Sequence, residues 1–182
     1  MTHRTAAARY ARALLDVALK EQADLSAIDA DLTGFADLLR QHEALRRALV
    51  HPSVPVPRKI AAVADLVARG RVHPLAGKTL QLLADRDRLV LVPEVAAAFR
   101  DRLLDHRNIV RASVTTAEPL SADRVQQIRQ SLAKATGRTV ELTAAVDPAI
   151  VGGMVARVGS TVYDGSVTTH LRRLRQRLAA SI

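Results

Sequence analysis

The spacing of the apolar residues changes once along the chain, near Asn108, and this change most constrains the fold. Before it, apolar residues recur every three or four positions, as in residues 25–39, which is the spacing of one face of a helix. After it, residues 110–114 alternate between apolar and other side chains, as a half-buried strand does. The sequence therefore predicts an α+β fold with two domains, residues 1–107 and 108–182.

Prolines, glycines and capping residues divide the first domain into a bundle of six helices. Asp24 is a plausible N-cap, Gly70 a plausible helix end, and prolines suit the first turns of three helices. The predicted helices cover about 4–21, 25–39 and 43–50, then run from Pro57 to Gly70, from Pro74 through Leu83, and from near Pro93. The first helix and residues 75–83 carry more apolar surface than one core stripe needs. Two explanations stay open: a groove for a partner's amphipathic helix, or a central position in the bundle.

The second domain is predicted to be a small α+β unit with a short sheet and two helices. Its first helix is bounded by Ser121 as N-cap and Gly137 as stop. Alternating segments at 140–146, 154–158 and 161–163 predict strands, with a hairpin turn at Gly159-Ser160. Ser166 is the expected N-cap of the last helix.

Composition excludes several classes of protein. The 182 residues contain no cysteine and no tryptophan, which excludes disulfides and thiol catalysis and argues against aromatic platforms for single-stranded nucleic acid. No apolar run approaches the roughly 20 residues that span a bilayer, so direct membrane insertion is not expected. The basic start is interpreted as the first helix rather than a leader. The formal charge of +9 keeps a basic, helix-rich nucleic-acid-binding protein as the main alternative, although no reading helix is recognisable.

No catalytic, metal or cofactor site is predicted. Gly152 and Gly153 precede a strand, whereas a phosphate-binding glycine loop opens a helix. These glycines are therefore interpreted as permitting close backbone approach, and the enzyme class rests on nothing else. The histidines are scattered without the i, i+3 or i, i+4 pairing typical of metal sites: His3, His42, His51, His73, His106 and His170.

Three stretches carry a resemblance to a known family: RYARALLDVA, LQLLADRDRLVLVPEV and VELTAAVDPAIVGGMVARVGSTVYDGSV. The chain resembles the delta subunit of F-type ATP synthases, the oligomycin-sensitivity-conferring protein of mitochondria. The residues that match the C-terminal signature of that family are Asp147, Gly152, Gly153, Arg157, Gly159, Asp164 and Gly165. Ala156 departs from it, since the family prefers a larger aliphatic residue there.

The resemblance implies a non-catalytic stator subunit that joins the alpha-beta hexamer to the peripheral stalk and resists rotor torque. It implies that the first domain receives the N-terminal helix of an alpha subunit between its first and fifth helices. The groove residues expected on this chain are Tyr10, Ala13, Leu14, Val17, Thr79, Leu80 and Leu83. Aspartate at Leu14 or Leu83 is expected to weaken this docking without unfolding the chain.

For the second domain, the resemblance implies contact with subunit b of the stalk. It also implies a single copy in a hetero-oligomer, placed on the cytoplasmic face of the bacterial plasma membrane.

Overall fold

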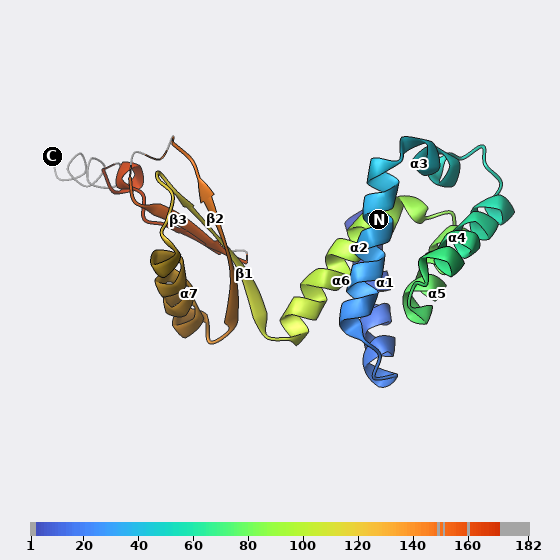
Figure 1. Ribbon diagram of the computed structural model, residues 1–182, viewed down its shortest axis with the longest axis horizontal. Coiled ribbons are helices and arrows are strands. Elements are labelled where there is room, and N and C mark those ends of the chain that lie inside the picture. The colour runs from blue at the N-terminus through green and yellow to red at the C-terminus, as the bar shows by residue number, and fades with distance from the viewer. Residues whose placement is uncertain (1–2, 149, 151, 160, 172–182) are drawn as a thin grey trace. The chain divides into compact units, whose positions relative to one another are not determined.

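The computed structural model describes residues 3–148, 150, 152–159 and 161–171 (Figure 1). The chain divides into two compact units, Met1–Leu103 and Leu104–Ile182. The predicted boundary after Arg107 lies close to this division, just beyond the last helix of the first unit. Helices and a four-stranded sheet are both present, so the predicted α+β class is confirmed.

The described residues of the first unit form helices that share one apolar core. They are α1 (His3–Lys20), α2 (Leu25–Gln41), α3 (Glu43–Val50), α4 (Val56–Gly70), α5 (Pro74–Asp85), the 3₁₀ helix η1 (Leu89–Leu91) and α6 (Val92–His106). The sequence did not predict η1, which connects α5 to α6. Because aromatic residues are 2% of the chain, this core is built mainly from Ala, Leu and Val.

Two helix ends in this unit show how local chemistry acts. The Asp24 carboxylate accepts the backbone N–H groups of Ser26 and Ala27, so the predicted N-cap of α2 is confirmed. The predicted end of α4 at Gly70 is confirmed, but Gly70 itself is helical. The next residue, Arg71, takes the left-handed conformation with φ of 50°, and its N–H bonds back to the last turn. A non-glycine residue in the left-handed region of backbone space costs conformational energy. There was therefore no reason in the sequence to expect Arg71 in that conformation.

The fifth helix, α5, has the largest buried share of the α-helices described in this unit. Leu75, Ala76, Gly77, Leu80, Leu83 and Ala84 are all buried among its twelve residues. Its apolar excess is therefore largely explained by a central position. Of the two explanations left open by the sequence, this one holds for most of α5, whereas α1 keeps a second apolar stripe that the core covers only in part.

The second unit is a sheet with the strand order β2-β1-β3-β4. The strands are β1 (Ile109–Thr116), β2 (Thr139–Val146), β3 (Met154–Val158) and β4 (Thr161–Asp164), and α7 (Ala122–Thr136) connects β1 to β2. β1 and β2 are parallel, and the other pairs are antiparallel. A parallel pair needs a crossover, and α7 supplies it.

The helix α7 covers one face of this sheet (Figure 1). Its Leu132 and Ala133 pack against Ala112, Val140 and Val158. The opposite face presents mostly exposed polar positions, which explains the alternation seen in the sequence. The predicted caps Ser121 and Gly137 are confirmed.

The last helix begins after Ser166, whose hydroxyl accepts the N–H of Thr169, and it is described as far as Leu171. Ser160 of the predicted hairpin turn and the rest of the last helix lie outside the described residues.

Candidate partner-binding grooves

The first helix has two apolar stripes. One comprises Ala7, Ala11, Leu14, Leu15 and Ala18, which are buried in the core. The other comprises Ala6, Tyr10, Ala13 and Val17, which recur every three or four positions along one helix face. All four remain at least partly exposed. The small residues of this second stripe permit a partner helix to approach the backbone closely.

A groove of about 680 Å³ lies between this second stripe and the α5–η1 segment. Its lining residues are His3, Ala6, Arg9, Tyr10, Ala13, Leu82, Arg88, Val90 and Leu91. The floor of the groove is apolar. Two arginines, Arg9 and Arg88, are among the lining residues, and no aspartate or glutamate is. Arg88 spans one wall and donates a hydrogen bond to the Tyr10 hydroxyl at 3.1 Å. We call this the α1–α5 groove.

Of the seven residues expected in this groove, three are buried in the core and four are at least partly exposed. Tyr10 and Ala13 line it, and Val17 is exposed further along the same stripe of α1. The half-buried Thr79 does not line it, and its hydroxyl donates to the Leu75 carbonyl one turn back.

The other three, Leu14, Leu80 and Leu83, belong to the core, with exposed fractions of 6%, 0% and 0%. The structure contradicts the expectation that aspartate at Leu14 or Leu83 would leave the chain folded, because it would bury an unpaired carboxylate.

Several lining residues were not singled out from the sequence. Leu82 is 46% exposed and lies one turn after Thr79, and Arg88 and Val90 follow the end of α5. Leu82 and Leu83 are both leucines in a helix that is apolar over most of its surface, so the pattern did not show which one faces outward. Arg88 and Val90 lie in and around η1, where three residues are too few to show a period.

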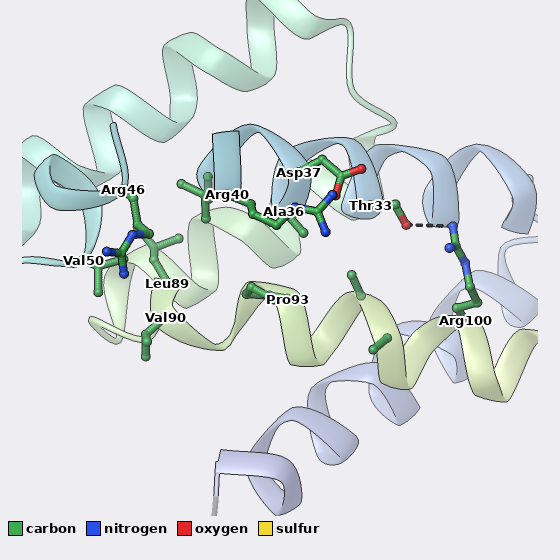
Figure 2. A pocket seen from close by; sticks show the side chains of 13 residues that line it. Thr33, Ala36, Asp37, Arg40, Arg46, Val50, Leu89, Val90, Pro93 and Arg100 are labelled. Carbon is green, nitrogen blue, oxygen red and sulfur yellow. Dashed lines mark hydrogen bonds and ion pairs between the residues drawn. The ribbon is translucent and has the colours of Figure 1, made fainter. Parts of the chain in front are cut away.

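A second groove, of about 540 Å³, lies between α2, α3, η1 and α6 (Figure 2). Its floor includes Ala36, Leu89, Pro93 and Ala96, and Val90 belongs to both grooves. We call it the α2–α6 groove. Arginines lie along its rim, but the chain's own carboxylates and hydroxyls bind them, which makes its charge internally compensated.

The partners of these rim arginines are well defined. Arg40 pairs with Asp37 at 3.0 Å, and Arg100 binds Asp29 and the Thr33 hydroxyl, the latter contact being drawn in Figure 2. Arg46 forms two hydrogen bonds with Glu43. Hydrogen bonds from Arg46, and to a smaller extent from Arg47, lower the pKa of the Glu43 carboxyl to about 2.

The glycine signature of the second unit is a site of close backbone contact. Gly153 has φ of 83°, and a Cβ there would overlap the carbonyl oxygen of Gly165. The Asp164 carboxylate accepts the N–H of Ser166 at 2.9 Å and the hydroxyl of Thr169 at 2.8 Å. The approach of Gly153 to Gly165 joins the start of β3 to the chain after β4, and the Asp164 hydrogen bonds join the end of β4 to the start of the last helix. The predicted close approach at Gly153 is therefore observed.

The other signature residues surround this contact. Gly152 accepts the N–H of Val167 at 3.0 Å, and Gly159 has φ of 57° at the end of β3. Asp147 follows β2, and its N–H bonds to the Thr116 carbonyl at 2.9 Å. Arg157 is exposed in β3. Among the described residues, no group of three or more His, Asp or Glu side chains could hold a metal ion.

An exposed apolar patch lies at one end of the same sheet. Val146 and Met154 both pair with Thr116, so they lie in one row across the strands. Tyr163 follows on β4, at 56% exposure, and Val167, which is 44% exposed, lies against Gly152 just before β3. We call this set the sheet-end patch: Val146, Met154, Tyr163 and Val167.

Comparison with known proteins identifies the family of this chain. The family described as "ATP synthase delta (OSCP) subunit" matches residues 6–178. The chain is 39% identical over 180 residues to ATP synthase subunit delta of Myxococcus xanthus (strain DK1622), covering 98% of both chains. It belongs to the ATP synthase delta (OSCP) family. It is also 34% identical to ATP synthase subunit delta of Citrifermentans bemidjiense, covering 96% of this chain and 97% of that one.

Solved structures of ATP synthases agree with this assignment to the delta family. A chain of the Toxoplasma gondii mitochondrial ATP synthase hexamer superposes with a TM-score of 0.69 at 30% identity, covering 95% of this chain and 97% of that chain. A chain of the Polytomella F-ATP synthase matches with a TM-score of 0.51 at 28% identity, over 55% of this chain and 87% of that one.

As a delta subunit, the chain is a non-catalytic component of the peripheral stalk, and its partners are other subunits of the ATP synthase. The comparisons give no support to the nucleic-acid-binding alternative. Among the residues described, no helix is both long and apolar enough to cross a bilayer. As a member of the delta family, the chain is part of the ATP synthase, a membrane-associated complex.

Proposed function

We propose that the two units of this delta subunit hold two different subunits of the stator. The bundle formed by residues 1–107 receives the N-terminal helix of one alpha subunit in the α1–α5 groove. The unit formed by residues 108–182 contacts subunit b. One copy of the subunit lies at the cytoplasmic face of the bacterial plasma membrane. It holds the hexamer to the stalk, so that the hexamer does not turn with the rotor.

The observation that carries the alpha-subunit proposal is the second apolar stripe of α1. Ala6, Tyr10 and Ala13 line a groove together with Leu82 and Val90, which are large apolar side chains about half exposed. An amphipathic helix that laid its apolar face into this groove would remove those side chains from water. Each fully buried leucine or valine contributes about 1.5–3 kcal/mol before ordering costs, so a few such contacts suffice for a specific complex.

The sheet-end patch supports the proposal for subunit b. It places Val146, Met154 and Tyr163 on the sheet face that α7 covers elsewhere, but beyond the part on which Leu132 and Ala133 pack. Two attachments on one adaptor hold a load better than either alone, since release of one leaves its partner at high local concentration.

Leu82→Asp tests the alpha-subunit proposal. Leu82 is exposed, so the variant is expected to fold, and it places a charge on the floor of the groove. Leu19→Asp is the matched control, because Leu19 is 39% exposed on α1 and does not line the groove. Titration calorimetry with a synthetic peptide of the alpha N-terminus is expected to show at least about tenfold weaker binding for Leu82→Asp alone. Equal affinities for the two variants would remove the groove assignment.

A pull-down with purified subunit b tests the second contact. Tyr163→Asp places a charge in the sheet-end patch, and Thr143→Asp places the same charge at an exposed position on the opposite face of the sheet. Loss of subunit b with the first variant alone is the expected result. Retention of subunit b by both variants would exclude the sheet-end patch.

A further inference from the structure

Arg88 differs from most other arginines around the two grooves in having no carboxylate partner. Its guanidinium donates a hydrogen bond from Nη1 to the Tyr10 hydroxyl, a neutral acceptor, at 3.1 Å. No carboxylate among the described residues pairs with it. The arginines of the α2–α6 groove, in contrast, each contact an aspartate or glutamate of the chain: Arg40, Arg46 and Arg100. Arg88 therefore keeps most of its five N–H donors for another acceptor.

The structure also fixes where this guanidinium stands. The Arg88 N–H donates to the Leu83 carbonyl at 2.7 Å, which holds the turn after α5. The preceding residue, Asp87, takes the left-handed conformation with φ of 53°, and its carboxylate binds the buried Nζ of Lys59 at 2.5 Å. With Tyr10 holding the other end of the side chain, little ordering is left to be done when a partner binds.

The surroundings select the chemistry of the acceptor. The α1–α5 groove has an apolar floor, and its charged lining residues are Arg9 and Arg88 with no acidic residue between them. In such a site a carboxylate is the acceptor that a guanidinium binds best, since two parallel N–H···O bonds can form and the charges are opposite. A docked helix would cover the groove and so reduce the solvent screening of that pair.

We infer that Arg88 is the anion-recognition residue of the α1–α5 groove and binds a carboxylate side chain of the docked helix. This inference rests on the proposed docking of the alpha subunit and specifies it further. The occupant is an amphipathic helix whose apolar stripe is flanked by an aspartate or glutamate opposite the turn between α5 and η1. The apolar floor supplies most of the affinity, and the charge pair sets the register of the helix in the groove.

Arg88→Gln in the full-length chain tests the inference, with Arg86→Gln as matched control. Both variants remove one positive charge from exposed side chains two positions apart, but Arg86 pairs with Asp85 and does not line the groove. With the alpha N-terminal peptide, Arg88→Gln is expected to weaken binding about tenfold, the effect of one charge-assisted hydrogen-bonded pair, while Arg86→Gln stays near the wild type. Circular dichroism checks that both variants are folded.

Peptides in which each acidic residue is replaced in turn by its amide complete the test. One replacement is expected to weaken binding to the wild type and to have no further effect on Arg88→Gln, because the pair is then already lost. If the wild type binds the peptide and Arg88→Gln binds it equally well, or no acidic position couples to Arg88, the inference is overturned while the docking proposal stands. If the wild type does not bind the peptide at all, the docking proposal itself fails, and this inference fails with it.

Discussion

Lys59 is the most completely buried charged residue described in the first unit. It lies in α4 with its side chain fully enclosed, and its Nζ contacts the Asp87 carboxylate. Asp87 is 46% exposed, so the pair is buried on one side only. An enclosed ammonium without a partner is costly, whereas a carboxylate that reaches water is not. Substitution of Asp87 should therefore lower the free energy of unfolding more than an apolar substitution of Lys59.

Asp87→Asn is expected to lower the free energy of unfolding by about 2 kcal/mol, because it leaves the buried Lys59 charge without its counter-ion. Asparagine tolerates the left-handed conformation at this position, so backbone strain does not confuse the result. Lys59→Met, which removes the charge and keeps the length of the side chain, is expected to cost less. Urea unfolding followed by circular dichroism measures both variants. A larger loss for Lys59→Met than for Asp87→Asn would contradict this account.

The helices α4 and α5 pack closely at Gly77, which of the glycines in the first unit leaves the least room for a side chain. A Cβ on Gly77 would lie 2.8 Å from Val67 Cγ1, so the missing side chain lets α5 approach α4. Gly34 in α2 offers the opposite case, since a Cβ there would have no neighbour within 4 Å. Both glycines lie inside helices, and only their surroundings differ.

Gly77→Ala is expected to destabilise the protein by about 1–2 kcal/mol, because the clash outweighs the better helix propensity of alanine. Gly34→Ala serves as control and is expected to raise the free energy of unfolding by up to about 1 kcal/mol. Thermal unfolding of the two variants should shift the melting temperature in opposite directions. Shifts of the same sign would show that the spacing of α4 and α5 does not depend on Gly77.

Most elements were predictable because their apolar periods are long and their caps are chemically distinct. Asp24, Ser121 and Gly137 act as their residue types indicate. The 3₁₀ helix η1 is too short to show a period, and the left-handed Arg71 follows a glycine that seemed the natural helix end. The groove was less predictable. Whether Leu82 or Leu83 faces out depends on which helix lies beside α5, and local sequence does not contain that information.

Each of the two units has an apolar core of its own. The larger core is contributed by residues up to Leu103, and the smaller one lies between α7 and the sheet. The strands of the sheet pair only with one another. Separate cores are typical of domains that can fold independently. The division therefore has a consequence for fragments of the chain.

A fragment of residues 1–106, which ends with α6, is expected to fold and to bind the alpha N-terminal peptide with the affinity of the full chain. The reason is that the α1–α5 groove and the larger core lie entirely within it. Circular dichroism and calorimetry on the fragment measure both properties. A fragment that is unfolded, or that is folded but loses more than about tenfold in affinity, would show that the second unit contributes to the groove.

The chain has two tyrosines and no tryptophan, and the tyrosines mark the two surfaces to which partners are assigned. Tyr10 lines the α1–α5 groove, and Tyr163 belongs to the sheet-end patch. Near-ultraviolet light therefore excites an intrinsic fluorophore at each surface, with no indole emission to obscure them. In a Tyr163→Phe protein the remaining phenol emission would come from Tyr10 alone, so occupancy of the groove could be followed without attaching a dye.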